Sequence, residues 1–233
     1  MKKQDFIFVL IIAVIVLPFL LLEPFSNAFM YMTVNHGYVM AFLKFGVLAT
    51  IGEVIGLKVK EGRYNYKGFG ILPRAIVWGI FGVWIAVAMK TFAIGAPAMV
   101  ESFGLSGIVE AMKGDFTPQK LLGAFSISVM MNTIFAPVFM TLHKITDTHI
   151  LENGGSVCAL LRPIKIKEII TKLNWGVQWS FVFKKTIPFF WIPAHTITFL
   201  LAPTMQVLFA ALLGVFLGLF LSIAAVLSRK EGK

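Results

Sequence analysis

The sequence predicts an all-α, polytopic transmembrane helical bundle of about six spans, folded as a single membrane domain over residues 1–233. Of the 233 residues, 58% are apolar and only 14% are charged, and the mean hydropathy is +0.85. A soluble domain of this composition would expose large apolar patches. Apolar runs of about 20 residues, the length that crosses a bilayer as a helix, recur along the chain. Lipid is therefore the expected solvent for much of the surface.

The first apolar run, 6–22, follows two lysines and ends at Glu23-Pro24. It is longer than the usual apolar core of a signal peptide, so 1–28 is interpreted as an added N-terminal span. Ser26-Asn27-Ala28 offers small residues for cleavage, and a signal peptide stays as the alternative.

The later runs are bounded by charges or prolines. The second ends in a charged Lys60–Arg63 turn, Pro97 follows the third, and Ala202-Pro203 divides the last two, because proline is tolerated where a helix opens and costly inside it. The longest connection, 141–186, follows the fourth. The five predicted spans that follow the first are 38–59, 75–96, 121–140, 187–201 and 204–227.

Lysine and arginine predict the orientation independently of hydropathy. With the N-terminus inside, 17 of the 21 cations fall in inner segments or at inner span ends, so both termini are expected in the cytoplasm. The remaining four are Lys44 and Lys90 within spans and Lys113 and Lys120 in outer loops.

An amphipathic interfacial helix is predicted near 163–177. Isoleucines recur there at helical spacing, and Lys165, Lys167 and Lys172 take the other face. These lysines are candidates for binding anionic lipid. Docking of this helix on other cytoplasmic loops remains an alternative.

Glu53 is the most informative residue, since a carboxylate in a span normally faces protein or water. It lies in a stripe of small residues, and the third span carries another, so these two spans are expected to pack closely. Antiparallel geometry makes Arg74, or else Lys58 or Lys60, the expected partner of Glu53, while Lys44 and Lys90 extend towards the outer surface. The helix-packing candidates are Gly46, Gly52, Gly56, Gly79 and Gly82.

Further polar residues fall inside the later spans: Asn132, His195, Thr198 and Gln206. They either line a path for a solute or hold helices together by hydrogen bonds. The pore or polar-network candidates are Glu53, Arg74, Lys90, Asn132, His195, Thr198 and Gln206.

Several classes of function are disfavoured. Cys158 stands alone, which excludes an intrachain disulfide, and no nucleotide-binding or hydrolase motif is present, so neither an enzyme nor a cofactor is expected. The basic residues form no single aromatic-laced face, which argues against nucleic acid. The spacing of His143, Asp147 and His149, with Glu152 nearby, matches no familiar metal site, so no metal is expected.

The C-terminal third carries a recognisable pattern. Trp191-Ile192-Pro193 is followed by Phe199, Pro203 and, about 20 residues later, Leu221-Ser222; upstream lie Gly52-Glu53 and Arg74. This order resembles the signature of the peroxisomal membrane protein 22 kDa family, also called the Mpv-seventeen family, over a core of 38–227. Trp191, Phe199, Pro203 and Ser222 are the signature positions. Glu53, His195 and Thr198 stand where that family has Asp, Gln and Asn.

The resemblance implies an integral membrane protein of mitochondrial inner or peroxisomal membranes, with some members forming weakly selective pores. The short leader and lysine-rich composition favour a bacterial relative in the cytoplasmic membrane. The leading hypothesis is a passive channel or facilitator for small solutes or ions. The alternative is a non-catalytic membrane scaffold, and an intramembrane enzyme using Glu53 and His195 is the least favoured. The bilayer is the expected partner, and homo-oligomerisation stays open.

Overall fold

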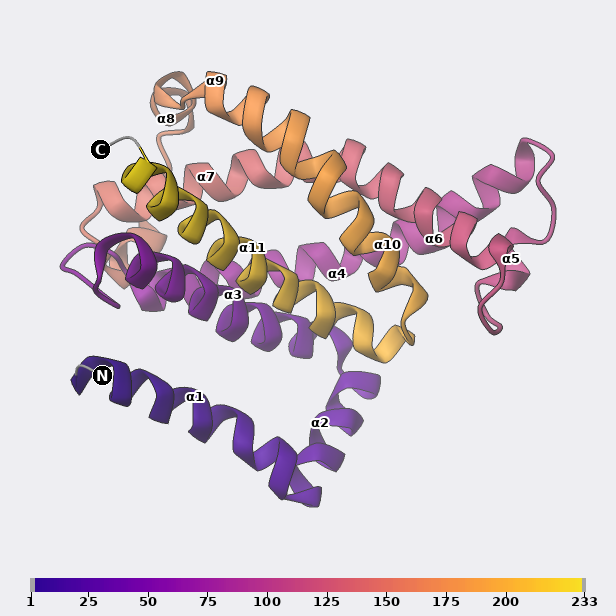
Figure 1. The fold of residues 1–233 in the computed structure, drawn as a ribbon, viewed down its shortest axis with the longest axis horizontal. Coiled ribbons are helices and arrows are strands. Elements are labelled where there is room, and N and C mark those ends of the chain that lie inside the picture. Colours follow the sequence, from indigo (N-terminus) through magenta and orange to yellow (C-terminus); the bar gives the residue numbers. More distant parts are fainter. Residues whose placement is uncertain (1–2, 232–233) are drawn as a thin grey trace.

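The computed structural model describes the backbone of residues 3–231 and the side chains of residues 3–219. Every regular element in that part of the chain is helical, so the all-α prediction is confirmed (Figure 1). The first half contains α1 (Lys3–Leu21), α2 (Glu23–Asn35), α3 (Gly37–Glu61), α4 (Ile71–Ser102), α5 (Ile108–Ala111) and α6 (Pro118–Met130). The second half contains the π-helical segment η1 (Met131–Phe135), α7 (Ala136–Glu152), the 3-10 helix η2 (Val157–Leu161), α8 (Ile166–Lys172), α9 (Trp175–Val177), the π-helical segment η3 (Gln178–Trp191), α10 (Ile192–Leu200) and α11 (Pro203–Glu231).

Four helices in the described residues are long and apolar enough to cross a membrane. They are α1, α3, α4 and the continuous helix of α6, η1 and α7, which has 35 residues. The predicted span 187–201 falls on η3 and α10, which are not among the four, and the predicted span 204–227 falls on α11, whose described apolar part, Pro203–Leu219, is shorter. The structure thus supports four of the six predicted spans by length and composition.

Prolines lie within or just after the π-helical segments. Proline has no N–H to donate, and its ring displaces the carbonyl four residues earlier, which widens the helix locally. Pro137 lies four residues after Thr133 in η1, Pro188 lies inside η3, and Pro193 lies four residues after Phe189 in η3. The fourth predicted span therefore continues to Glu152, and the first part of the predicted connection 141–186 is helical.

Two other sequence predictions need correction. The third span, expected to stop before Pro97, continues as α4 through Pro97 to Ser102, where Phe103 ends the helix. The single interfacial helix predicted near 163–177 is two short helices, α8 and α9. Leu173 is extended, and the Asn174 side chain accepts a hydrogen bond from the Val177 N–H, so a new helix begins there.

Small residues bring α3 and α4 together, as predicted. A Cβ added at Gly82 would lie 2.5 Å from the Ala41 carbonyl oxygen, and one at Gly46 would lie 3.0 Å from that of Ala75. At Gly79 an added Cβ would meet the Phe42 ring. Gly52 instead faces α11, where an added Cβ would lie 2.9 Å from Cα of Val215, and Gly56 is buried in α3. The glycines of α3 thus serve two neighbours.

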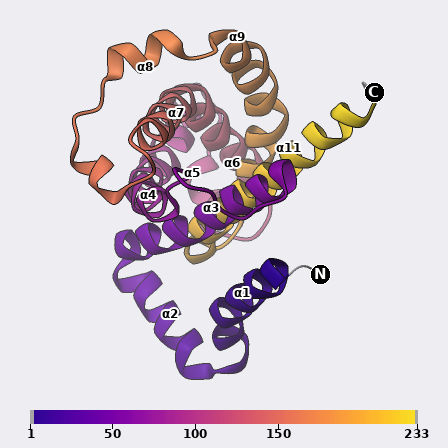
Figure 2. The ribbon, with the colours of Figure 1, turned by 90° about the vertical axis from the view of Figure 1, so that its left-hand side faces the viewer.

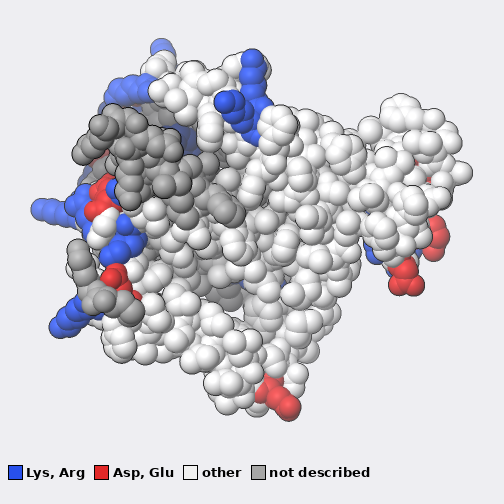
Figure 3. Space-filling model, viewed as in Figure 1, with Lys and Arg blue, Asp and Glu red and all other residues white. Residues whose placement is uncertain are grey.

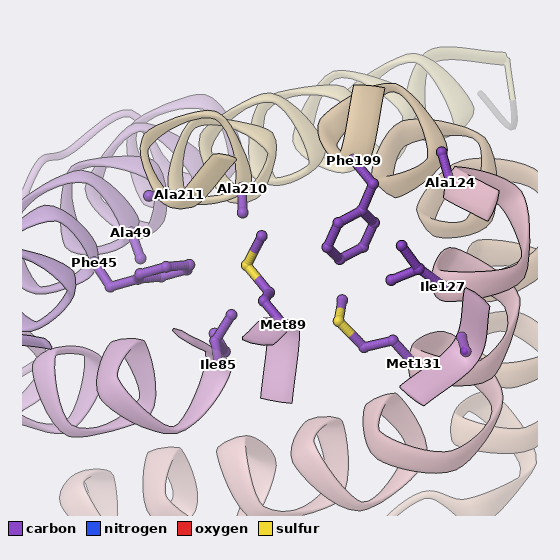
Figure 4. Close-up of a cluster of buried hydrophobic side chains, with 11 residues drawn as sticks. Phe45, Ala49, Ile85, Met89, Ala124, Ile127, Met131, Phe199, Ala210 and Ala211 are labelled. Atoms are coloured by element: carbon purple, nitrogen blue, oxygen red, sulfur yellow. The ribbon is translucent and has the colours of Figure 1, made fainter. Parts of the chain in front are cut away.

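The apolar core lies between these helices and α6, η1 and α10 (Figure 4). Phe199 of α10 points towards Ile127 and Met131, while Phe45 of α3 lies beside Ile85 of α4. Helices α1 and α2 lie to one side of this bundle, and α8 and α9 lie on the opposite side (Figure 2). No side chain of α1 is buried.

The two ends of the bundle differ in charge. Helix α1 begins, α3 ends, α4 begins and α11 ends at the left-hand end in Figure 1, and Lys and Arg side chains gather there in Figure 3. We call this the basic end. We call the place where α2 joins α3 and α10 joins α11, at the other ends of α3 and α11, the far end; α5 and the adjoining parts of α4 and α6 project beyond it (Figure 1).

Candidate functional site

A network of charged side chains joins three helices near the basic end. Glu53 comes from α3, Arg74 from the first turn of α4, and His143 and Asp147 from α7. Nη1 of Arg74 donates to Oε2 of Glu53 at 2.5 Å and to Oδ1 of Asp147 at 2.6 Å. The Arg74 side chain is only 5% exposed. The predicted pairing of Glu53 with Arg74 is confirmed, and one guanidinium bridges two carboxylates.

The second oxygen of Glu53 is also bound. Nε1 of Trp78 donates to Oε1 of Glu53 at 2.8 Å, and Nε2 of His143 lies 3.1 Å from the same oxygen. The same nitrogen lies 3.8 Å from Oδ1 of Asp147. By charge counting, the four ionisable groups carry one net negative charge when His143 is neutral and none when it is protonated. One proton therefore decides the formal charge of the network.

The local fold fixes Arg74 before it meets its partners. Gly70 precedes α4 with a φ of 75°, a left-handed conformation that favours glycine. Arg74 Nε donates to the Phe69 carbonyl at 2.8 Å, and the guanidinium lies over the Phe69 ring. A Cβ at Gly155 would lie 2.5 Å from the Gly68 carbonyl oxygen, so the loop after α7 packs tightly on the loop before α4.

Helical periodicity places His143 and Asp147 on one face of α7, because residues four apart are neighbours there. From the sequence alone, both residues are only weak metal candidates in the predicted connection 141–186, together with His149. His149 is not part of the network: its Nε2 lies 2.9 Å from the Ala159 carbonyl oxygen, to which it donates. The signal that could have found the pair was the continuation of the fourth apolar run as a helix.

Glu53, His143 and Asp147 each offer a ligand atom, and these atoms lie within 4.8 Å of one another. Arg74, however, already binds an oxygen of both carboxylates. A metal cation at this place would have to displace a buried guanidinium that carries the same sign of charge. The donor set therefore fits an internal ion-pair network better than a metal site.

An aromatic seam runs from this network along the contact of α4 with α7. The Trp78 and His143 rings lie 4.5 Å apart, centroid to centroid. Further along, Phe139 stacks on Phe135 at 5.5 Å, and Phe135 meets the edge of Trp84 at 4.8 Å. These rings fill the space between the network and the middle of the bundle.

A second polar group lies beyond the seam. Asn132 of η1 is fully buried, and its amide lies 3.0 Å from Nδ1 of His195 in α10. The same amide donates to the Ser128 carbonyl at 2.8 Å, and the Ser128 hydroxyl donates to the Ile192 carbonyl at 2.7 Å. This group ties the fourth membrane-length helix to α10.

The other predicted polar residues do not join either group. The Thr198 hydroxyl donates to Ala194 of its own helix, and the Gln206 amide donates to the Leu201 carbonyl. Lys90 is exposed on a cavity at the far end. Glu53 and His195, the pair considered for an intramembrane enzyme, each bond to different partners. The sequence-predicted set is therefore divided among separate places.

The residues of the family pattern have structural roles where their side chains are described. Phe199 is 1% exposed in the core, and Pro203 opens α11. The indole N–H of Trp191 is buried, with no hydrogen-bond partner among the described residues. The Ser222 side chain lies outside the described residues.

No protein-family model, curated protein or solved structure matches this chain. The resemblance to the peroxisomal membrane protein 22 kDa family therefore stays a prediction from the sequence. The class that the fold and the network define is an all-helical protein with several membrane-length helices and a charged network between them.

Proposed function

We propose that this chain is an integral membrane protein of about six spans that passes small polar solutes or ions passively, with the charged network at the inner end of the path. The observation that carries this proposal is the convergence of Glu53, Arg74, His143 and Asp147 from three helices. Ionisable groups inside spans are costly and commonly mark solute or proton pathways. In this proposal the basic end faces the cytoplasm of a bacterial cell, as in the positive-inside rule.

The path runs from the network along the aromatic seam to Asn132 and His195. In this conformation the rings of Trp84, Phe135 and Phe139 contact one another along this route. The seam is therefore the proposed gate, and solute passage requires these rings to separate. Lys165, Lys167 and Lys172 are exposed and are proposed to bind anionic lipid beside the path.

The test is flux through purified protein in sealed liposomes. Wild-type protein is expected to speed the passage of small ions or polar solutes, and Glu53→Gln is expected to shift selectivity away from cations, because a carboxylate favours cations electrostatically. Glu61→Gln is the matched control, since Glu61 is exposed at the end of the same helix and pairs only with Arg63 in the described structure. Wild-type protein that passes nothing would refute the transport proposal.

A scaffold without transport is the second candidate function. The apolar core around Met89, Met131 and Phe199 favours it, because that core separates the polar groups instead of opening a water-filled route between them. A scaffold predicts that Glu53→Gln lowers stability while flux stays at the level of empty liposomes. The two measurements on the same variant separate the candidates.

A further inference from the structure

The far end of the bundle contains a cavity of about 680 Å³ that the proposed path does not use. It lies among the end of α2, the start of α3, the middle of α4 and the start of α11. Lys44 and Lys90 both line it, and His36, Asn35 and Thr204 add polar groups. The described residues of its lining include no Asp or Glu.

Lys44 is the unusual member of this lining. Its side chain is buried, at 5% exposure, although a lysine is seldom buried without a carboxylate. Its ammonium donates to the Thr33 hydroxyl at 3.0 Å and lies 4.6 Å from the centre of the Phe29 ring. An ammonium has three donors, and one hydroxyl accepts from only one of them. The contacts present therefore leave hydrogen-bonding capacity and a whole positive charge at the cavity.

Helix ends of both polarities meet at the same place. Both α3 and α11 begin at this cavity, with Gly37, Pro203 and Thr204 among its lining. The first turn of a helix has N–H groups without partners in the helix and a partial positive charge. No side chain caps the start of α3. The end of α2 also lies at this cavity and carries the opposite partial charge, so the two lysines are the features that attract an anion here.

Lys90 lies at the far end, well away from the charged network along α4. Arg74 and Lys90 belong to the same helix and are separated along its axis by about 24 Å, at about 1.5 Å per residue. A bilayer core is about 30 Å thick, so Lys90 comes close to one headgroup region when Arg74 lies near the other. The cavity is thus within reach of a lipid headgroup or of a solute from that side.

We propose that this cavity binds a phosphate-type oxyanion through Lys44 and Lys90, supplied either by the headgroup of an anionic lipid or by a free anion. A multivalent oxyanion would accept hydrogen bonds from both ammonium groups together. This inference rests on the far-end cavity alone and is independent of whether the chain transports anything.

The experiment uses the full chain in a neutral maltoside detergent and follows its thermal unfolding as a probe is titrated. The probes are phosphatidylglycerol, inorganic phosphate and, as the zwitterionic control, phosphatidylcholine. If phosphatidylglycerol stabilises the protein and inorganic phosphate does not, the site binds a lipid headgroup. If inorganic phosphate stabilises the protein, the site binds free anions. Either result supports the proposal when the variants below also behave as expected.

Lys44→Met/Lys90→Met is expected to weaken the binding at least about tenfold, because charge-assisted hydrogen bonds are lost. Lys113→Met, at an exposed lysine of the loop region between α4 and α6, is the matched control and is expected to bind as wild type does. If the double variant does not purify, Lys90→Met alone carries the test, since Lys90 is exposed. Unchanged binding in these variants, or no saturable binding of either anionic probe, would overturn the proposal.

Discussion

Removal of the Arg74 guanidinium is the sharpest test of the charged network. Arg74→Met leaves the Glu53 and Asp147 carboxylates in the bundle without the cation that both of them bind at 2.5–2.6 Å. Loss of one partner from a buried ion pair costs about 3–5 kcal/mol, because the remaining charge is left uncompensated. We expect the free energy of unfolding to fall by about that amount.

The assay is reversible unfolding in mixed micelles, with two further variants. Arg63→Met makes the same change at an exposed arginine that pairs with Glu61, and exposed pairs contribute only about 0–1 kcal/mol. Arg74→Met combined with Glu53→Gln and Asp147→Asn removes the uncompensated charges and should recover much of the loss. The reasoning fails if Arg74→Met costs no more than Arg63→Met, or if the triple variant recovers nothing.

Two more predictions concern other parts of the fold. Gly82→Ala should destabilise the protein by about 1–3 kcal/mol, because the added Cβ would meet the Ala41 carbonyl. Gly95→Ala, in the same helix, is the control: open space surrounds this position, so the change should be neutral or slightly stabilising. Thermal unfolding of the two variants compares them. Burial and the hydrogen bond to Asp5 raise the pKa of Tyr64 above its ordinary value of 10. The stability from this contact should persist below pH 10 and be lost as pH rises through the raised pKa, and Asp5→Asn should lower that pKa in a phenolate absorbance titration.

The Tyr64 prediction also concerns how α1 is attached. Besides that hydrogen bond, Asp5 pairs with Lys58 at 2.6 Å, and Phe8 stacks on Tyr64 at 4.5 Å between ring centroids. These contacts hold the start of α1, whereas its end meets α2 through the Phe19 ring, which lies 5.2 Å from that of Phe29. Loss of the Asp5 contacts should therefore loosen α1 and leave the main core intact.

Much of the architecture could be predicted from local composition. The runs at 6–22, 38–59 and 75–96 became α1, α3 and α4, because a long apolar stretch has few structures available to it in lipid besides a helix. Helix ends were less predictable. The predicted span 121–140 contains Pro137 and ends soon after it. In the structure a π-helical segment precedes Pro137, and the helix continues to Glu152.

Some residues of the candidate site could likewise be predicted from the sequence, and others could not. The exclusion of Glu53 from lipid could be predicted, because a charged side chain in a span is stable only beside protein or water. Its pairing with Arg74 could be predicted too, because in antiparallel neighbouring spans these two residues lie at similar depths in the membrane. Trp78, His143 and Asp147 could not be added without knowing that α7 continues past residue 140 and packs beside α4. Of the further polar candidates, Asn132 and His195 contact each other, while Thr198 and Gln206 donate to backbone carbonyls nearby in the sequence.

By itself the sequence determined that the chain is helical, that apolar stretches of membrane length recur in it, and that its cations collect between those stretches, since these properties depend on residues close together in the chain. Only the tertiary structure decided which polar groups meet. Arg74 and Asp147 are far apart in the sequence, and their contact depends on how three helices pack around small residues and on how two glycine-containing loops fit together. Periodicity specifies the face of a helix, but the partner of that face is chosen by packing of the whole bundle.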